Sequence, residues 1–87
     1  MSMAASAETI REQTRKYLTA SLSRQIADDE DIFATGLVNS LFAVQLVAFV
    51  ETRFGITVEN EELNPAYFSS AEAITAFVVG KTAAQAG

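Results

Sequence analysis

Ser40 stands beside Asn39 at the head of the most clearly amphipathic stretch of the chain, and its hydroxyl is the first candidate for chemistry. A serine nucleophile needs a neighbouring base to accept its proton, and the 87 residues include no His and no Cys. The same absences exclude imidazole or thiolate zinc sites and cysteine nucleophiles. We therefore expect the chain not to be an enzyme, and any reaction at Ser40 requires a base from another protein.

Ser40 has two readings from its position alone. A serine at a helix start most often caps the helix, because its oxygen accepts a free backbone N–H. Asn39 is an equally good cap, which leaves the Ser40 hydroxyl spare. Free N–H groups and the positive end of the helix dipole also stabilise an anion such as a phosphate ester there. Ser40 is therefore either a plain cap or a hydroxyl that another enzyme modifies.

The elements around this site are expected to be helices. Apolar residues recur at helical spacing over residues 7–21, 41–54 and 71–79, and residues 61–68 can hold a single turn broken near Pro65. Four Gly and one Pro are too few for the turns of an all-β domain. The sequence predicts an all-α fold, a small four-helix bundle with three longer helices and one short one.

The expected helices carry residues typical of helix ends. Ser6 or Thr9 is a suitable cap for the first helix, and Ser69 with Glu72 forms a capping box before the last. Gly55 follows the middle helix, where a left-handed residue often ends a helix. The inward apolar positions predict a core of Leu18, Phe33, Leu46, Val50, Phe54, Ile74 and Phe77.

A long connection over residues 22–39 precedes Ser40. Connections longer than about 12–15 residues inside a compact domain are usually functional or disordered. This one has a turn at Thr35-Gly36 and apolar residues that can fix it to the bundle, namely Ile26, Ile32, Phe33, Leu37 and Val38. We therefore expect the connection to be ordered and to lead directly into the site.

Charge is distributed unevenly along the chain. The net charge is −5, with +2 over residues 1–24 and −8 over residues 25–80. Nucleic-acid binding is not expected, because phosphate contacts need a basic patch. The acidic block is either a solvated surface or a docking face for basic partners. Neither a secretory signal nor an apolar run long enough for a membrane span is present, so we expect a cytoplasmic protein.

The residues around Ser40 resemble an acyl carrier protein. The family pattern is an acidic and aromatic loop, a Gly-Leu turn, and Asp-Ser-Leu at the head of the second helix. This chain has Asp31-Ile32-Phe33-Ala34-Thr35-Gly36-Leu37-Val38-Asn39-Ser40-Leu41, and Phe54-Gly55-Ile56 after the helix. The similarity covers roughly residues 8–80. It implies a single carrier domain over residues 1–87, with flexible ends at about 1–6 and 81–87.

The resemblance implies a carrier without catalysis of its own. A phosphopantetheinyl transferase would move 4′-phosphopantetheine from coenzyme A onto Ser40, with Asn39 as the helix cap beside it. The terminal thiol of the arm then carries an acyl or aminoacyl group as a thioester, so a chain without Cys can perform thiol chemistry. The implied partners are an acyl-loading or adenylating enzyme, and an acyltransferase, a ketosynthase or tailoring enzymes, which a monomeric carrier visits in turn.

The chain departs from the family pattern at two places. Asn39 replaces the usual Asp, so the cap is kept and the charge is lost. By their place along the helix, the residues that match the partner-facing positions of the family are Leu41, Phe42, Val44 and Ala48. The outer face has fewer acids than fatty-acid carriers, and its apolar cluster of Phe42, Val44 and Phe49 is either a partner patch or a local core.

These departures favour a dedicated pathway over general fatty-acid synthesis. The run from Val38 to Leu46 resembles free-standing carriers of polyketide or mixed peptide–polyketide pathways, which points to secondary-metabolite or antibiotic biosynthesis. A D-alanyl or aminoacyl carrier is a related alternative. A helical interaction module that never bears a cofactor, with Ser40 as a plain cap, is the alternative from a different class.

Overall fold

The computed structural model describes residues 6–34, 36 and 38–86, and every regular element in this part is helical. The elements are α1 (Ala7–Leu22), α2 (Ser40–Phe54), a single 3₁₀ turn η1 (Asn60–Glu62), α3 (Pro65–Phe68) and α4 (Ala71–Ala86). Three helices have 15 or 16 residues and α3 has four. The expected all-α bundle of three longer helices and one short one is confirmed.

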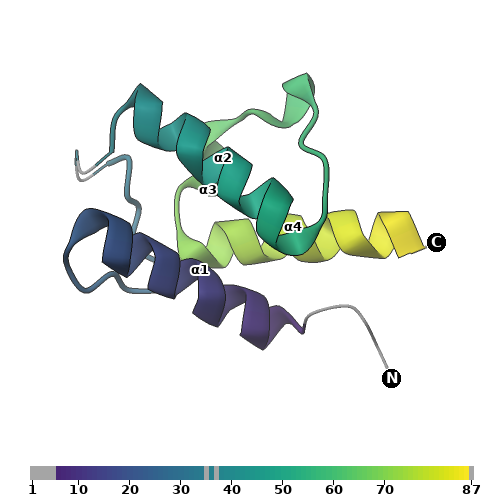
Figure 1. Ribbon diagram of the computed structural model, residues 1–87, viewed down its shortest axis with the longest axis horizontal. Coiled ribbons are helices and arrows are strands. Elements are labelled where there is room, and N and C mark those ends of the chain that lie inside the picture. Colours follow the sequence, from purple (N-terminus) through teal and green to yellow (C-terminus); the bar gives the residue numbers. More distant parts are fainter. Residues whose placement is uncertain (1–5, 35, 37, 87) are drawn as a thin grey trace.

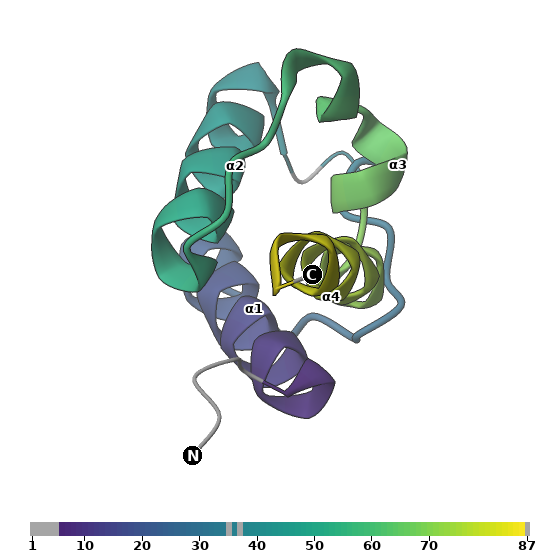
Figure 2. The same ribbon diagram turned by 90° about the vertical axis from the view of Figure 1, so that its right-hand side faces the viewer.

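Helix α4 is the centre of the arrangement, because it packs on both α1 and α3. Figure 2 looks along α4, with α1 and α2 on one side and α3 on the other. Figure 1 shows α2 on the opposite side of α4 from the start of α1, with the segment containing η1 rising beside it. The α2 helix therefore has one side toward α1 and α4 and another toward the η1–α3 segment.

The helix caps agree with the sequence at some ends and correct it at others. Ser6 caps α1, since its Oγ accepts the N–H of Thr9 at 3.1 Å. Gly55 ends α2 with a φ of 66°, as expected. The cap of α4 is Ser70, whose Oγ accepts the N–H of Ala73 at 3.0 Å. The expected capping box at Ser69 is wrong, because the N–H of Glu72 that it needs donates to the Asp28 carbonyl at 2.8 Å instead.

Two helix boundaries also differ from expectation. Pro65 does not break a turn but begins α3, where a helix has no use for the missing N–H. The last helix does not end near Val79, because α4 continues to Ala86. Gly80 disfavours a helix interior by only about 1 kcal/mol relative to Ala, and the residues after it are mostly good helix formers. The flexible start expected at residues 1–6 lies outside the described residues except for Ser6.

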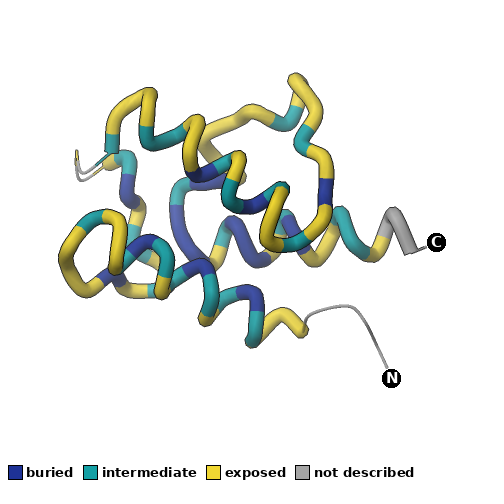
Figure 3. Tube along the Cα trace, in the orientation of Figure 1, coloured by how far each residue is buried: buried dark blue, intermediate teal, exposed yellow. Residues whose placement is uncertain are grey.

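The core lies where α1, α2 and α4 meet, and Figure 3 shows its buried positions in dark blue. Four predicted core residues are buried, namely Leu18, Leu46, Val50 and Ile74. The three predicted aromatic residues, Phe33, Phe54 and Phe77, are only half-buried and pack against the core. The buried hydrophobic residues missing from the predicted core are Ile10, Ile26, Ile32, Ile56, Phe68, Ala71 and Val78.

The long connection before α2 is fixed to the bundle, as the sequence predicts. Ile26 and Ile32 are both buried. The carbonyl of Asp28 accepts the N–H of Glu72 at the start of α4 at 2.8 Å, and the Asp28 carboxylate pairs with Arg15 of α1 at 3.3 Å. The expected contributions of Thr35 and Leu37 lie outside the described residues. The connection therefore enters α2 from an anchored position.

None of the helices in residues 6–34 and 38–86 combines the length and apolar character needed to cross a bilayer.

Candidate functional site

Asn39 and Ser40 divide two roles at the start of α2. The Asn39 side-chain oxygen accepts the N–H of Phe42 at 2.9 Å, and its backbone carbonyl accepts the N–H of Ala43 at 3.0 Å. Asn39 is thus the helix cap, as expected. Ser40 is the first helical residue and is exposed, and its hydroxyl has no hydrogen-bond partner among the described residues. The reading of Ser40 as the cap is wrong.

The surroundings of Ser40 suit an anion better than a nucleophile. The N–H groups of Ser40 and Leu41 have no acceptor within the helix, because they belong to its first turn. No acidic residue stands in this turn, so a phosphate ester on the Ser40 oxygen meets free donors and the positive end of the dipole without a neighbouring carboxylate. Within the described residues no cluster of His, Cys, Asp or Glu can hold a metal ion.

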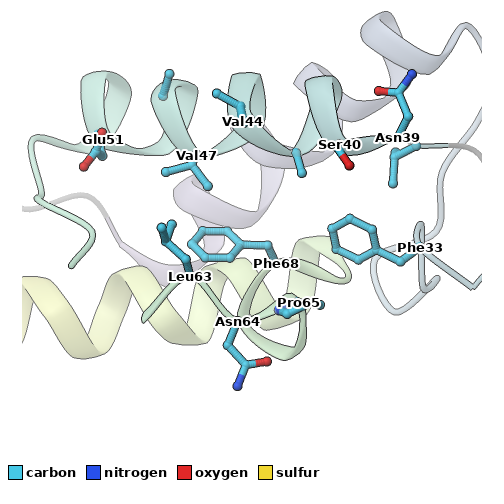
Figure 4. A pocket seen from close by; sticks show the side chains of 13 residues that line it. Phe33, Asn39, Ser40, Val44, Val47, Glu51, Leu63, Asn64, Pro65 and Phe68 are labelled. Atoms are coloured by element: carbon cyan, nitrogen blue, oxygen red, sulfur yellow. The ribbon is translucent and has the colours of Figure 1, made fainter. Parts of the chain in front are cut away.

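An apolar groove of about 690 Å³ begins beside Ser40 and runs along α2. The α2 side contributes Ser40, Ala43, Val44, Val47, Ala48 and Glu51. The other walls are Phe33, Val38 and Asn39 from the connection and Leu63, Asn64, Pro65 and Phe68 from the segment around α3. Figure 4 shows Val47 facing Leu63 and Phe68 across the groove, with Ser40 near one end and Glu51 at the other.

The length and polarity of the groove follow from α2. Ser40 and Glu51 are eleven positions apart, which corresponds to about 16 Å of helix. The side chains between them on this face are apolar, so the groove has polar groups mainly at its ends. At the far end the Glu51 carboxylate accepts the N–H of Val58 at 2.9 Å, which ties the segment after α2 back to the helix.

A second polar contact holds the opposite wall. Lys81 of α4 donates to Glu62 of η1 at 2.9 Å, and the N–H of Glu59 donates to the same carboxylate oxygen at 2.9 Å. The hydrogen bond from Lys81, and then that from the Glu59 backbone, hold the pKa of Glu62 below its ordinary value of 4.5. The segment that leads through η1 to α3 is thus attached at Val58, which binds Glu51, and at Glu62, which binds Lys81. Leu63 follows the second of these contacts directly.

The expected apolar cluster on α2 is split between two environments. Val44 is 67% exposed, whereas Phe42 and Phe49 are half-buried. Both rings stack on Tyr17 of α1, with centroids 6.2 Å and 4.0 Å away respectively. Phe42 and Phe49 therefore form a local core between α1 and α2, and the reading of one exposed cluster is wrong.

The other residues matched to partner-facing positions remain accessible. Leu41 is 65% exposed, and Ala48 is exposed two turns further along the same face of the helix. The partner role of Leu41, Phe42, Val44 and Ala48 stays a prediction. The groove itself was missed from the sequence, because Leu63 and Pro65 carry no local signal that they face α2.

Together, the fold and the site define a small helical protein with a free serine hydroxyl at a helix start, beside an apolar groove. The sequence matches no protein-family model, and no curated protein matches it significantly.

Proposed function

We propose that this protein is an acyl carrier protein whose Ser40 bears a 4′-phosphopantetheine arm. The observation that supports this most directly is the division of roles at the start of α2. Asn39 caps the helix, so the exposed Ser40 hydroxyl is free to become a phosphodiester without loss of the cap. In a serine that caps a helix, by contrast, the side-chain oxygen already accepts a backbone N–H.

The attachment step requires a second protein. The Ser40 oxygen attacks the phosphorus of coenzyme A that bears the pantetheine, a base of the transferase takes the serine proton, and adenosine 3′,5′-bisphosphate leaves. The transferase also supplies most of the ligands of the Mg²⁺ ion. The contribution of this chain is to present the hydroxyl at the positive end of the α2 dipole, where the phosphodiester charge is stabilised. The chain is a substrate in this step and not an enzyme.

The apolar groove supports the cargo part of the proposal. It opens beside Ser40 and extends about 16 Å along α2, which is enough to cover part of the arm or a short acyl chain. The apolar side chains would shield such a chain from water, with a gain of about 25 cal/mol per Å² of apolar surface buried. The arm also raises the effective concentration of the cargo at each docked partner.

The proposed cargo is an acyl or extender-unit thioester in polyketide or related secondary-metabolite biosynthesis. The carrier would act as a monomer in the cytoplasm. Its partners would be a phosphopantetheinyl transferase, an enzyme that loads or adenylates the cargo, and an acyltransferase, ketosynthase or tailoring enzyme that uses it.

Intact-mass measurement tests the attachment. The purified protein is incubated with coenzyme A, Mg²⁺ and a broad-specificity phosphopantetheinyl transferase, and we expect one phosphopantetheinyl group per chain. Ser40→Ala should gain no mass, while Ser21→Ala, which removes another exposed serine hydroxyl, should be modified like the wild type. Absence of modification in the wild type, or the same modification of Ser40→Ala, would overturn the proposal and favour an unmodified interaction module.

A further inference from the structure

The exposed side of α2 has almost no charge. We call it the outer face, made of Leu41, Val44, Gln45, Ala48, Thr52 and Arg53, all of which are exposed. Positions 41, 45, 48 and 52 repeat at helical spacing, and Val44 lies beside them. Arg53 is the one charged residue of this set, in a chain whose net charge is −5.

Glu51, the acidic residue of α2, faces the groove and is not part of the outer face. Glu51 lines the groove and accepts the N–H of Val58 at 2.9 Å, and Figure 4 shows its carboxylate at the groove end. The other acids after residue 24 lie in the connection, in and around η1, and at the start of α4, namely Asp28, Asp29, Glu30, Asp31, Glu59, Glu61, Glu62 and Glu72. None of these acids belongs to the outer face.

Arg53 is held in place without an acidic partner. Its guanidinium carbon lies 5.8 Å from the centroid of the Phe49 ring, a cation–π distance. In the part of the chain that the structure describes, the ion pairs engage Arg15, Lys16, Arg24 and Lys81, and none engages Arg53. Its charge is therefore available to a group outside this chain.

A shallow hollow places this charge beside apolar surface. The hollow is lined by Tyr17, Gln45, Ala48, Phe49, Thr52 and Arg53. Its aromatic lining is the stacked pair of Tyr17 and Phe49, whose rings are nearly parallel at 10°. A side chain that enters this hollow meets both aromatic carbon and the Arg53 guanidinium.

We propose that the outer face docks partner enzymes whose contact surface is apolar and presents a carboxylate to Arg53. Leu41 and Val44 would bury apolar area against the partner, and the carboxylate would pair with a guanidinium that the carrier leaves unpaired. A basic docking surface would instead be repelled by Arg53 and find no carboxylate on this face. The inference rests on the proposed function, because it concerns enzymes that must reach an arm on Ser40.

The test compares two phosphopantetheinyl transferases that differ in the charge of their docking surface, one apolar with an acidic residue and one basic. The quantity measured is kcat/KM for modification of Ser40, with the carrier as the varied substrate. We expect the wild type to be the better substrate of the acidic-surfaced transferase. Arg53→Glu should lower kcat/KM with that transferase by about threefold to tenfold, because an attraction becomes a repulsion, and raise it with the basic-surfaced one.

Two further variants separate the charge of Arg53 from other effects. Arg53→Gln should show about half of the change on a logarithmic scale, since it removes the charge without reversing it. Lys16→Glu changes the net charge by the same amount on α1, where the Lys16 side chain is 72% exposed. We expect it to alter kcat/KM by less than about twofold, because Lys16 is not part of the outer face and exposed charges outside a contact are screened by salt.

The outcomes distinguish the two proposals. If neither transferase modifies Ser40, the proposed function fails. If both modify it and Arg53→Glu behaves like Lys16→Glu, only the docking inference fails. Sedimentation equilibrium of the unmodified protein addresses the other occupant of this face. A dimer that Val44→Glu disperses would assign the outer face to a second copy of the chain and overturn the inference.

Discussion

The contact between α1 and α4 and the groove between α2 and the α3 segment are built from the same kinds of apolar residue but reach different degrees of packing. Leu18 of α1 and Ile74 and Val78 of α4 are fully buried. Along α2 only Leu46 and Val50 are buried, while the next positions toward α3 line an open groove. The groove is lined by apolar residues of α2, so its openness does not come from polarity of that helix. The opposite wall includes α3, which has only four residues.

The two regions are also held by different forces. Apolar burial stabilises the α1–α4 contact, where a buried aliphatic side chain contributes about 1.5–3 kcal/mol. The groove wall has one buried side chain, Phe68, and is otherwise attached by the contacts of Glu51 with Val58 and of Glu62 with Lys81. A typical intramolecular hydrogen bond adds about 1 kcal/mol net. The groove wall is therefore the part that opens at lower free-energy cost.

Truncation of apolar side chains on the two sides gives the largest expected difference. Leu18→Ala should lower the free energy of unfolding by about 3–5 kcal/mol, because it leaves a cavity in a fully packed site. Val47→Ala on the groove wall should cost less than about 1 kcal/mol, since the half-buried side chain already borders open space. Urea unfolding measures both. Equal costs would show that the groove is as tightly packed as the core.

Removal of the helix cap at the groove entrance gives an intermediate effect. Asn39→Ala should lower the free energy of unfolding by about 1 kcal/mol, because the N–H of Phe42 loses its acceptor. Asn39→Ser is the matched control and should stay within about 0.5 kcal/mol of the wild type, since serine caps a helix about as well. The measurement is again urea unfolding. A loss with Asn39→Ser as large as with Asn39→Ala would mean that capping is not what Asn39 contributes.

Local sequence signals predicted what depends on a few neighbouring residues. The bundle, the cap at Asn39 and the helix end at Gly55 follow from spacing and residue type over a few positions. The predicted order of the connection is likewise confirmed by the burial of Ile26 and Ile32. The free hydroxyl of Ser40 follows by elimination once Asn39 is the cap.

The sequence could not predict what depends on contacts between distant segments. Ser69 and Ser70 are equally good caps by residue type, but the carbonyl of the distant Asp28 accepts the N–H of Glu72 that a cap at Ser69 would need, so Ser70 caps the helix. The sequence allows Phe42 and Phe49 to be an exposed cluster, whereas the structure stacks both rings on Tyr17 of α1. The groove has the same origin, because its far wall is positioned by hydrogen bonds between segments and by no periodicity along the chain.

The ion pair on the groove wall gives the smallest predicted effect, and its sign follows from the pKa. Lys81 and the Glu59 N–H hold the pKa of Glu62 below 4.5 in the folded protein. The unfolded chain therefore takes up the proton more readily than the folded one as the pH falls. The stability that this carboxylate contributes is fully present above its ordinary pKa of 4.5 and is lost as the pH falls through the lowered folded value.

Glu62→Gln isolates this contribution, because glutamine keeps the size of the side chain and does not titrate. The wild type should be more stable than Glu62→Gln at neutral pH, and the difference should shrink as the pH is lowered from about 6 to about 3. Thermal unfolding over this range measures the difference, and all other carboxylates cancel between the two proteins. Glu61→Gln, which removes an exposed neighbouring acid and leaves the contact between Glu62 and Lys81 in place, is the matched control. A difference that stays constant with pH would mean that Glu62 holds the wall by its shape and not by its charge, and the groove wall would then resemble the core in how it is stabilised.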